Sequence, residues 1–360
     1  CFNGTNGRII LNIAGGTPTY SILWSNGNVT QNLINIPYGN YCKGKCIFCG
    51  TVRNTQKDLS PERVTQLIVS KKGYGDSVHF ESADFFYDPE GAERLAYELA
   101  RNTQLRRIPK MAIARVDEIK DHGLIKKMAQ AGFKIIAFGV ESFNDEVLRN
   151  IGKDTTAIQN IEALDFAIEA GIKPGINLIL FTPWDTVDTT LHTIDLSLTY
   201  MERGAYINVV PGIFVGYGRK ISRIESVVDY DIYDYPGLKK PFRFPRQTKI
   251  LDRELSSLQN KIFNKLNELE AENDYPEWAK RSVSVYSLLI FKAFVKVLQE
   301  EQISRYKEID LLVARIDSAV QRVIRAEAST LLEEKHPEAV GVSEAWFNPF
   351  NHLLTKAILE

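Results

Sequence analysis

The stretch Cys42-Lys43-Gly44-Lys45-Cys46-Ile47-Phe48-Cys49 places three thiols at spacings of four and three along a short segment that contains a glycine. The only other cysteine, Cys1, lies far upstream. Three cysteines so close in sequence cannot all form disulfides with one another. Their joint use as thiolate ligands of a metal is therefore the better interpretation, because the thiolate is the form that binds metals.

The number of thiols limits the kind of metal site. A tetrahedral zinc site normally takes a fourth protein ligand, often from a second Cys or His pair. No second pair follows here, and the histidines are scattered singly: His79, His122, His192, His336 and His352. An iron–sulfur cube also takes four ligands, so three thiolates leave one iron open for chemistry. An incomplete zinc site and unpaired thiols stay as alternatives.

The CxxxCxxC spacing with Phe48 just before the last cysteine resembles the signature of the radical SAM superfamily. The resemblance implies that Cys42, Cys46 and Cys49 hold a 4Fe–4S cluster whose open iron binds S-adenosylmethionine (SAM). Reduction of SAM then yields a 5′-deoxyadenosyl radical that abstracts hydrogen from an unidentified substrate. It also implies an electron donor such as a flavodoxin or ferredoxin. The resemblance spans about residues 31–220 and is nearest to the branch often fused to cobalamin-binding domains.

Composition is that of an ordinary globular protein. The 360 residues are enough for about two domains, with 44% hydrophobic and 25% charged residues. A net charge of −1 gives no global field that would recruit nucleic acid or an anionic membrane. No apolar run is long enough to span a bilayer. Four cysteines, three of them clustered, favour a reducing compartment, and we expect a cytoplasmic protein.

Residues 1–41 predict a short β segment. Strands are expected at 8–13 and 19–24, and the Asn26-Gly27 pair is a strong hairpin signal. The landmarks GGTPTY and WSNG resemble part of an SprB-type repeat of bacterial surface adhesins. A generic β-hairpin is the alternative. Because the chain starts at Cys1 and shows no signal peptide, we expect a fragment or a processed product.

Helix and strand patterns alternate from residue 59 to about 214. A first strand within residues 31–36 is followed by predicted strands at 77–80, 110–114, 133–140, 175–181 and 206–214. Helices are predicted between them, for example one that begins at Ser60-Pro61 and ends before Gly73. Such alternation indicates parallel βαβ units and an α/β fold. The family resemblance turns this into a partial (β/α)6 barrel with its core in residues 42–220.

The ends of the predicted strands carry the residues that the resemblance links to SAM, since barrel sites form from the loops after the strands. Ser82, Ala83 and Asp84 follow the second strand and resemble the segment that meets the SAM amino group, where many relatives carry two aspartates. Arg115 and Asp117 follow the third strand and resemble an RxD element whose guanidinium could take the methionyl carboxylate. Pairing of these two residues with each other is the alternative.

The next two strand ends are expected to contact the nucleoside of SAM. Glu141 and Ser142 resemble a GxES segment whose carboxylate accepts the ribose hydroxyls, although Glu141 could instead cap a helix. Thr182 lies in the turn expected near adenine, as does Phe48 in the cysteine segment. A place for Phe48 in the hydrophobic core is the alternative.

The remainder of the chain predicts a linker and a helical domain. Residues 221–247 are rich in Tyr, Asp and Pro, and we expect an irregular linker or lid. Residues 248–360 show apolar residues at helical spacing and predict a helical C-terminal bundle. Besides the radical SAM enzyme, two functional alternatives stay open: a non-catalytic surface or interaction protein, and a zinc-binding module.

Overall fold

The computed structural model describes the chain in ten segments. These are residues 33–39, 41–50, 59–71, 77–119, 122–216, 219–233, 242–272, 274–280, 282–303 and 309–333. The strands predicted at 8–13 and 19–24 lie outside these segments.

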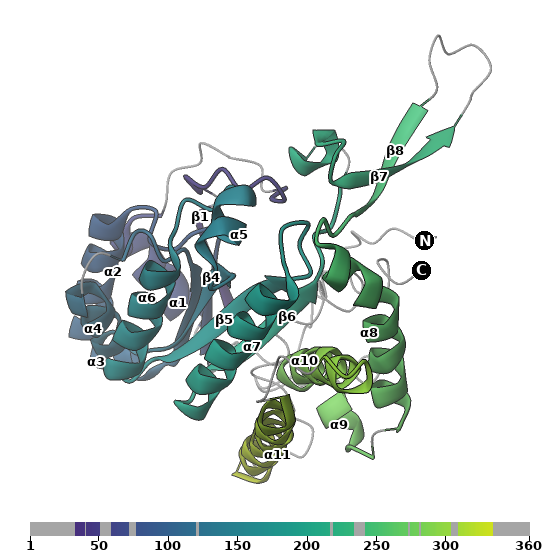
Figure 1. Cartoon of the computed structure of the whole chain (residues 1–360). Coiled ribbons are helices and arrows are strands. Elements are labelled where there is room, and N and C mark those ends of the chain that lie inside the picture. The colour runs from purple at the N-terminus through teal and green to yellow at the C-terminus, as the bar shows by residue number, and fades with distance from the viewer. Residues whose placement is uncertain are drawn as a thin grey trace, which may run out of the picture.

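A six-stranded parallel sheet organises the molecule, and its strands follow one another in sequence order from β1 to β6 (Figure 1). All five neighbouring pairs are parallel. The strands are β1 (Leu33–Gly39), β2 (Ser77–Ser82), β3 (Lys110–Ala114), β4 (Phe133–Glu141), β5 (Lys173–Leu180) and β6 (Tyr206–Pro211). Each parallel pair needs a crossover connection, which the intervening helices provide. The predicted α/β fold with six strands is confirmed.

The crossover helices are mostly those that the sequence predicts. They are α1 (Pro61–Lys71), α2 (Pro89–Arg101), α3 (Thr103–Arg107), α4 (His122–Gln130), α5 (Asp145–Asn150), α6 (Ala157–Glu169) and α7 (Val187–Glu202). Capping boxes at Thr156 and Thr186 satisfy the first backbone N–H groups of α6 and α7. The short helix α3, capped by Asn102, was not predicted, and α5, capped by Asn144, begins close to the helix start expected after Glu141.

The core beneath the first four strands is aromatic. Phe80 packs against Phe85 and Phe133, with ring centroids 5.2 and 5.3 Å apart. Tyr38 at the end of β1 stacks on Phe85 at 4.7 Å. All four side chains are at most 2% exposed. This packing fixes the strand ends, from which the polar residues of the site project.

The C-terminal helices cover the edge of the sheet rather than forming a separate body (Figure 1). They are α8 (Arg253–Glu272), α9 (Glu277–Lys280), α10 (Val283–Glu300) and α11 (Ile309–Glu333). Within α10, the Ser287 hydroxyl accepts a hydrogen bond from the Val209 N–H at 2.9 Å, and the Ser284 hydroxyl donates to the Ile207 carbonyl at 3.1 Å. Edge-strand backbone groups of β6 are thereby satisfied by side chains of a helix. The predicted helical C-terminal region is confirmed.

Residues 221–247 contain regular structure where an irregular segment was expected. β7 (Val228–Tyr233) and β8 (Phe242–Thr248) form an antiparallel hairpin that extends away from the sheet (Figure 1). The short helix η2 (Ile221–Arg223) precedes it. The tyrosines and the isoleucine of β7 favour a strand even though aspartates alternate with them. The expectation of an irregular segment was wrong because it gave too much weight to Asp and Pro.

Candidate functional site

The cysteine loop, defined as residues 41–50, is attached to two elements at the carboxyl ends of the strands. The Ile47 N–H donates to the carbonyl of Ile151 at 2.9 Å, and the Ile47 carbonyl accepts from Ile221 of η2 at 3.0 Å. Arg219 donates from Nη1 to the Phe48 carbonyl at 2.7 Å. The loop is therefore held between the end of α5 and the segment after β6.

Two side chains of the cysteine loop pack against an apolar cluster. Ile47 and Phe48 pack against buried side chains of α5, the β6–η2 connection and β7, namely Val147, Leu148, Ile151, Ile213, Val215, Ile221, Val227 and Val228, together with Ile179 of β5. Phe48 therefore takes part in a small hydrophobic core, which was the alternative to its predicted place beside adenine. Because these side chains are apolar, they also limit access of water to the inner side of the loop.

Arg115 lies at the end of β3 and reaches the cysteine loop. Its Nε and Nη2 each donate to a carboxylate oxygen of Asp117 at 2.8 Å, and its Nη1 lies 3.7 Å from the Sγ of Cys46. The residue is 5% exposed. Burial lowers the pKa of the guanidinium, but Asp117 and the thiolates of Cys46 and Cys42 outweigh burial and raise it above its ordinary value. Arg115 is thus a fixed positive charge.

A second buried ion pair, Lys153 with Glu141, also acts on Cys46. Lys153 Nζ donates to Glu141 Oε1 at 3.0 Å, and the two side chains are 4% and 13% exposed. Burial raises the pKa of the Cys46 thiol, Lys153 and Arg115 lower it, and Glu141 raises it. The charges of two cations, Lys153 and Arg115, therefore both favour the thiolate form of Cys46. Glu141 does not cap the following helix as the alternative had it, because the cap of α5 is Asn144.

Asp84 holds the turn after β2 and keeps one oxygen unused. Its Oδ1 accepts from the backbone N–H groups of Arg115 at 3.0 Å and Phe86 at 3.3 Å, and its own N–H donates to Ser82 Oγ at 3.2 Å. Burial raises the pKa of the Asp84 carboxyl. Among the described residues, Oδ2 is buried and has no hydrogen-bond partner. A buried unsatisfied oxygen at a strand end is a place where a ligand can bind.

The turn after β5 is built around a buried carboxylate that the sequence analysis missed. Asp185 accepts from the Thr182 N–H at 2.8 Å and from the Thr189 hydroxyl at 3.2 Å. Burial raises its pKa to about 6. Phe181 has a φ of 59°, and the buried Thr182 Oγ1 has no partner within the described part of the chain. An Asp just before the Thr cap of α7 was the available signal.

The structure brings some of the predicted site residues into contact and separates others. Cys46, Arg115 and Asp117 form one contact group, and Asp84 bonds the backbone of Arg115. Ser142 is buried and accepts from the Asn144 N–H at 3.1 Å, so its hydroxyl serves the helix start. Lys153 was part of the quoted sequence pattern but had no predicted role.

The chemistry of the donor set, three free thiols in one short loop, fits a thiolate-bound cluster. All three cysteines of the loop are thiols rather than disulfides. Within the described segments, no group of three or more His, Cys, Asp or Glu side chains could hold one metal ion. An iron–sulfur cube takes its thiolates at separate irons, so its ligands need not converge on one point. Nearby cations, Arg115 and Lys153, would offset the negative charge of a thiolate cluster.

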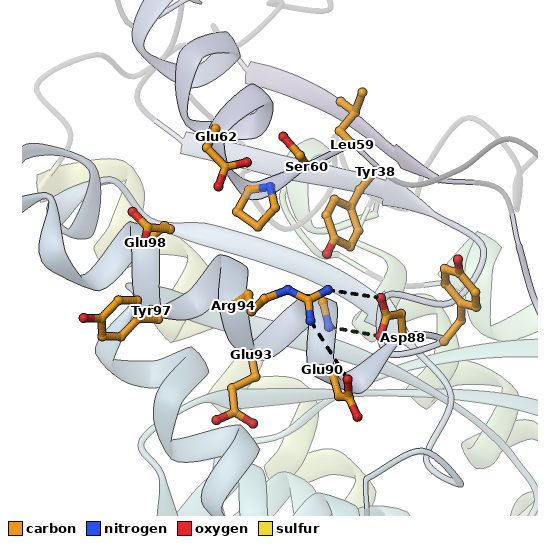
Figure 2. A pocket seen from close by; sticks show the side chains of 13 residues that line it. Tyr38, Leu59, Ser60, Glu62, Asp88, Glu90, Glu93, Arg94, Tyr97 and Glu98 are labelled. Atoms are coloured by element: carbon orange, nitrogen blue, oxygen red, sulfur yellow. Dashed lines mark hydrogen bonds and ion pairs between the residues drawn. The ribbon is translucent and has the colours of Figure 1, made fainter.

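A surface groove of about 910 Å³ lies apart from these residues, between α1 and α2 (Figure 2). Arg94 crosses it and contacts Asp88 at 3.8 Å and Glu90 at 4.0 Å. Its lining includes Tyr38, Glu62, Tyr87 and Tyr97 and none of the predicted cluster or SAM residues. The groove is therefore not the candidate site.

Two segments of the chain match known protein families. Residues 36–197 match the profile of the Radical SAM superfamily, and residues 1–29 match that of the SprB repeat. The chain matches no curated protein sequence significantly. None of the helices in the described residues has the length and apolarity that a bilayer crossing requires.

Solved structures show the same fold at low identity. The radical S-adenosylmethionine methyltransferase TsrM from Kitasatospora setae, solved with tryptophan substrate and a SAM analogue bound, is 16% identical, with a TM-score of 0.53; the match covers 76% of this chain and 61% of TsrM. The cobalamin-dependent S-adenosylmethionine radical enzyme OxsB is 14% identical, with a TM-score of 0.53; the match covers 90% of this chain and 57% of OxsB. This chain therefore spans less than two thirds of either structure.

Proposed function

We propose that this chain, whose residues 36–197 belong to the radical SAM superfamily, is an enzyme that binds one 4Fe–4S cluster through Cys42, Cys46 and Cys49 and binds SAM at the open iron. The main support is the position of the cysteine loop, held at the strand ends with Arg115 and Lys153 beside Cys46. When bound, the cluster and SAM supply the electron transfer that yields a 5′-deoxyadenosyl radical for hydrogen abstraction from substrate.

The residues at the strand ends would bind and orient SAM. The unused Oδ2 of Asp84, the backbone around Ala83 and the Ser82 hydroxyl are assigned to its amino group. Glu141, held by Lys153, is assigned to the ribose hydroxyls. A fixed carboxylate loses little conformational entropy when it accepts two hydroxyl donors.

The adenine side of the proposed site is formed by Thr182 and the segment at Ser142, and Phe48 lies in the apolar part of the cysteine loop. The Thr182 hydroxyl lacks a partner within the described segments and is assigned to the adenine side together with the backbone next to Ser142. Phe48 closes the apolar side of the loop, where its role is to exclude water. The reductant would be a flavodoxin- or ferredoxin-type donor, and we expect a cytoplasmic enzyme because such a cluster needs a reducing compartment.

Anaerobic reconstitution with iron and sulfide, followed by SAM and dithionite, tests the proposal. The wild-type protein is expected to form 5′-deoxyadenosine, and Cys46→Ser is expected to form none because it lacks one cluster thiolate. Cys1→Ser is the matched control, since Cys1 lies outside the cysteine loop, and it should keep the wild-type yield. A cluster-loaded wild type that forms no 5′-deoxyadenosine contradicts the proposal. Binding of about one zinc without visible absorbance would favour the zinc module.

A further inference from the structure

The side chain of Arg115 is already engaged by a carboxylate of its own chain. Asp117 accepts from both Nε and Nη2 at 2.8 Å, which is the bidentate geometry that a guanidinium uses for any carboxylate. The fork that the sequence resemblance assigns to the methionyl carboxylate of SAM is therefore occupied. Both N–H groups of Nη1 and the second N–H of Nη2 are left for other partners.

The third nitrogen of the guanidinium, Nη1, faces a proposed cluster ligand. Arg115 Nη1 lies 3.7 Å from Cys46 Sγ. Gly44 makes this approach possible, because a Cβ at Gly44 would overlap Nη1. At the other end of the residue, the Arg115 N–H is bonded to Asp84 at 3.0 Å. Arg115 is thus buried and held both at its backbone N–H and at its guanidinium, whose Nη1 faces the Cys46 sulfur.

We propose that Arg115 is a positioning residue that donates a hydrogen bond from Nη1 to the Cys46 thiolate and raises the reduction potential of the cluster, and that it does not bind the SAM carboxylate. This inference rests on the proposed function. Hydrogen bonds to the sulfurs are one of the factors that set cluster potentials. A donor that carries a positive charge stabilises the reduced cluster more than the oxidised one, because reduction adds negative charge.

Arg219 provides a matched control. It carries the same charge and also donates to the cysteine loop, but its Nη1 bonds the Phe48 carbonyl oxygen at 2.7 Å and not a sulfur. Arg115→Gln and Arg219→Gln each remove one positive charge beside the loop. The first removes a donor to the Cys46 sulfur, whereas the second removes a donor to a backbone carbonyl.

Redox titration of the reconstituted 360-residue chain, monitored by electron paramagnetic resonance without SAM, separates the two roles. Arg115→Gln is expected to lower the ratio of reduced to oxidised cluster at a fixed potential about tenfold, a shift of about 59 mV. Arg219→Gln should shift the potential much less. In equilibrium dialysis, the SAM affinity of Arg115→Gln should stay within about threefold of wild type, well under 1.4 kcal/mol.

Two results would overturn the inference. One is an unchanged potential in Arg115→Gln together with a SAM affinity lowered about tenfold or more, which would make Arg115 a SAM ligand. The other is an equal shift in both variants, which would show a general charge effect. If Arg115→Gln does not retain iron, Arg115→Lys is titrated in its place. A potential below wild type is then expected, because an ammonium lacks the fork that reaches Asp117 and the sulfur together, and an unchanged potential overturns the inference. A wild type that loads no cluster would instead refute the proposed function.

Discussion

The two ends of the parallel sheet use the same unusual backbone conformation in different ways. At the amino ends of β4, β5 and β6, the residues with positive φ are Gly132, Gly171 and Gly204. At the carboxyl ends of β4 and β5 they are Glu141 and Phe181, with φ of 62° and 59°. Glycine adopts this conformation without strain, whereas other residues do so at a cost. Strain is therefore concentrated at the end that carries the cysteine loop.

Buried polar groups differ between the two ends in the same sense. Lys110 begins β3 and is 1% exposed, and its Nζ donates to the carbonyls of Leu105 at 2.6 Å and Ile108 at 2.7 Å. It joins the end of α3 to the sheet and serves stability. At the other end, Asp84 Oδ2 and Thr182 Oγ1 keep unused bonding capacity among the described residues. The comparison teaches that Lys110 at the amino end is satisfied by its own chain, while Asp84 and Thr182 at the carboxyl end keep capacity to bind a ligand.

The largest effect should come from breaking the buried pair at the carboxyl end. Lys153→Met leaves Glu141 without its partner and is expected to lower the free energy of unfolding by about 4 kcal/mol. Adding Glu141→Gln should restore most of the loss, because the unpaired charge is then gone. Urea unfolding of the cluster-free protein measures both values. A double variant as unstable as Lys153→Met would show that the pair matters through packing instead.

The glycines at the amino end can be compared with each other. Gly132→Ala is expected to cost about 3 kcal/mol, because positive φ adds strain and the new Cβ would overlap the backbone carbonyl of Arg106. Gly171→Ala should cost about 1 kcal/mol, since its φ is also positive but no atom lies within 4 Å of the new Cβ. Thermal and urea unfolding test the difference. Equal losses would mean that strain alone decides.

The buried Asp185 predicts a pH dependence at the carboxyl end. Its pKa is about 6 in the folded protein and 3.8 ordinarily, so the folded state binds more protons between these values and stability contributed by Asp185 rises as the pH falls. Relative to Asp185→Asn, the wild type should gain about 2 kcal/mol between about pH 7 and about pH 4.5. Urea unfolding of both proteins at several pH values measures this gain. A difference that does not change with pH would place the carboxyl in contact with water.

The smallest effect is expected for an exposed pair. Lys261 and Glu301 are 2.7 Å apart, but their side chains are 52% and 36% exposed. Lys261→Ala should change the free energy of unfolding by less than about 0.5 kcal/mol, because water and salt screen such pairs. The same urea titration provides the check. A loss as large as that of Lys153→Met would remove the distinction between buried and exposed pairs on which the comparison depends.

Most of the sheet was predictable because its strands are continuous apolar runs bounded by glycines. The predicted strand at 110–114 coincides with β3, and the predicted first strand lies at the start of β1. The short helix α3 was missed because five residues are too few to show a helical period, and its Asn102 cap was the only signal. The β7–β8 hairpin was hidden by its Asp and Pro content.

The candidate site was predictable in its residues but less so in its pairings. The sequence, through the family resemblance and the expected strand ends, predicted Cys46, Arg115 and Glu141 at one end of the sheet. It could not tell whether Arg115 pairs with Asp117, because both arrangements satisfy the same local pattern, and the structure has the pair. Lys153 and Asp185 were missed as partners because their roles depend on burial, which is set by the packing of distant segments.

The hydrogen bonds that Ser284 and Ser287 of α10 make with the backbone of β6 have a practical consequence for the design of shortened versions of this protein. A shortened chain that stops soon after β6 would retain the cysteines and every proposed SAM residue. It would also expose the backbone N–H and C=O groups along the edge of β6. The exposed edge of β6 is expected to pair with the edge of a second molecule. The shortened protein should therefore aggregate under conditions in which the longer chain stays in solution.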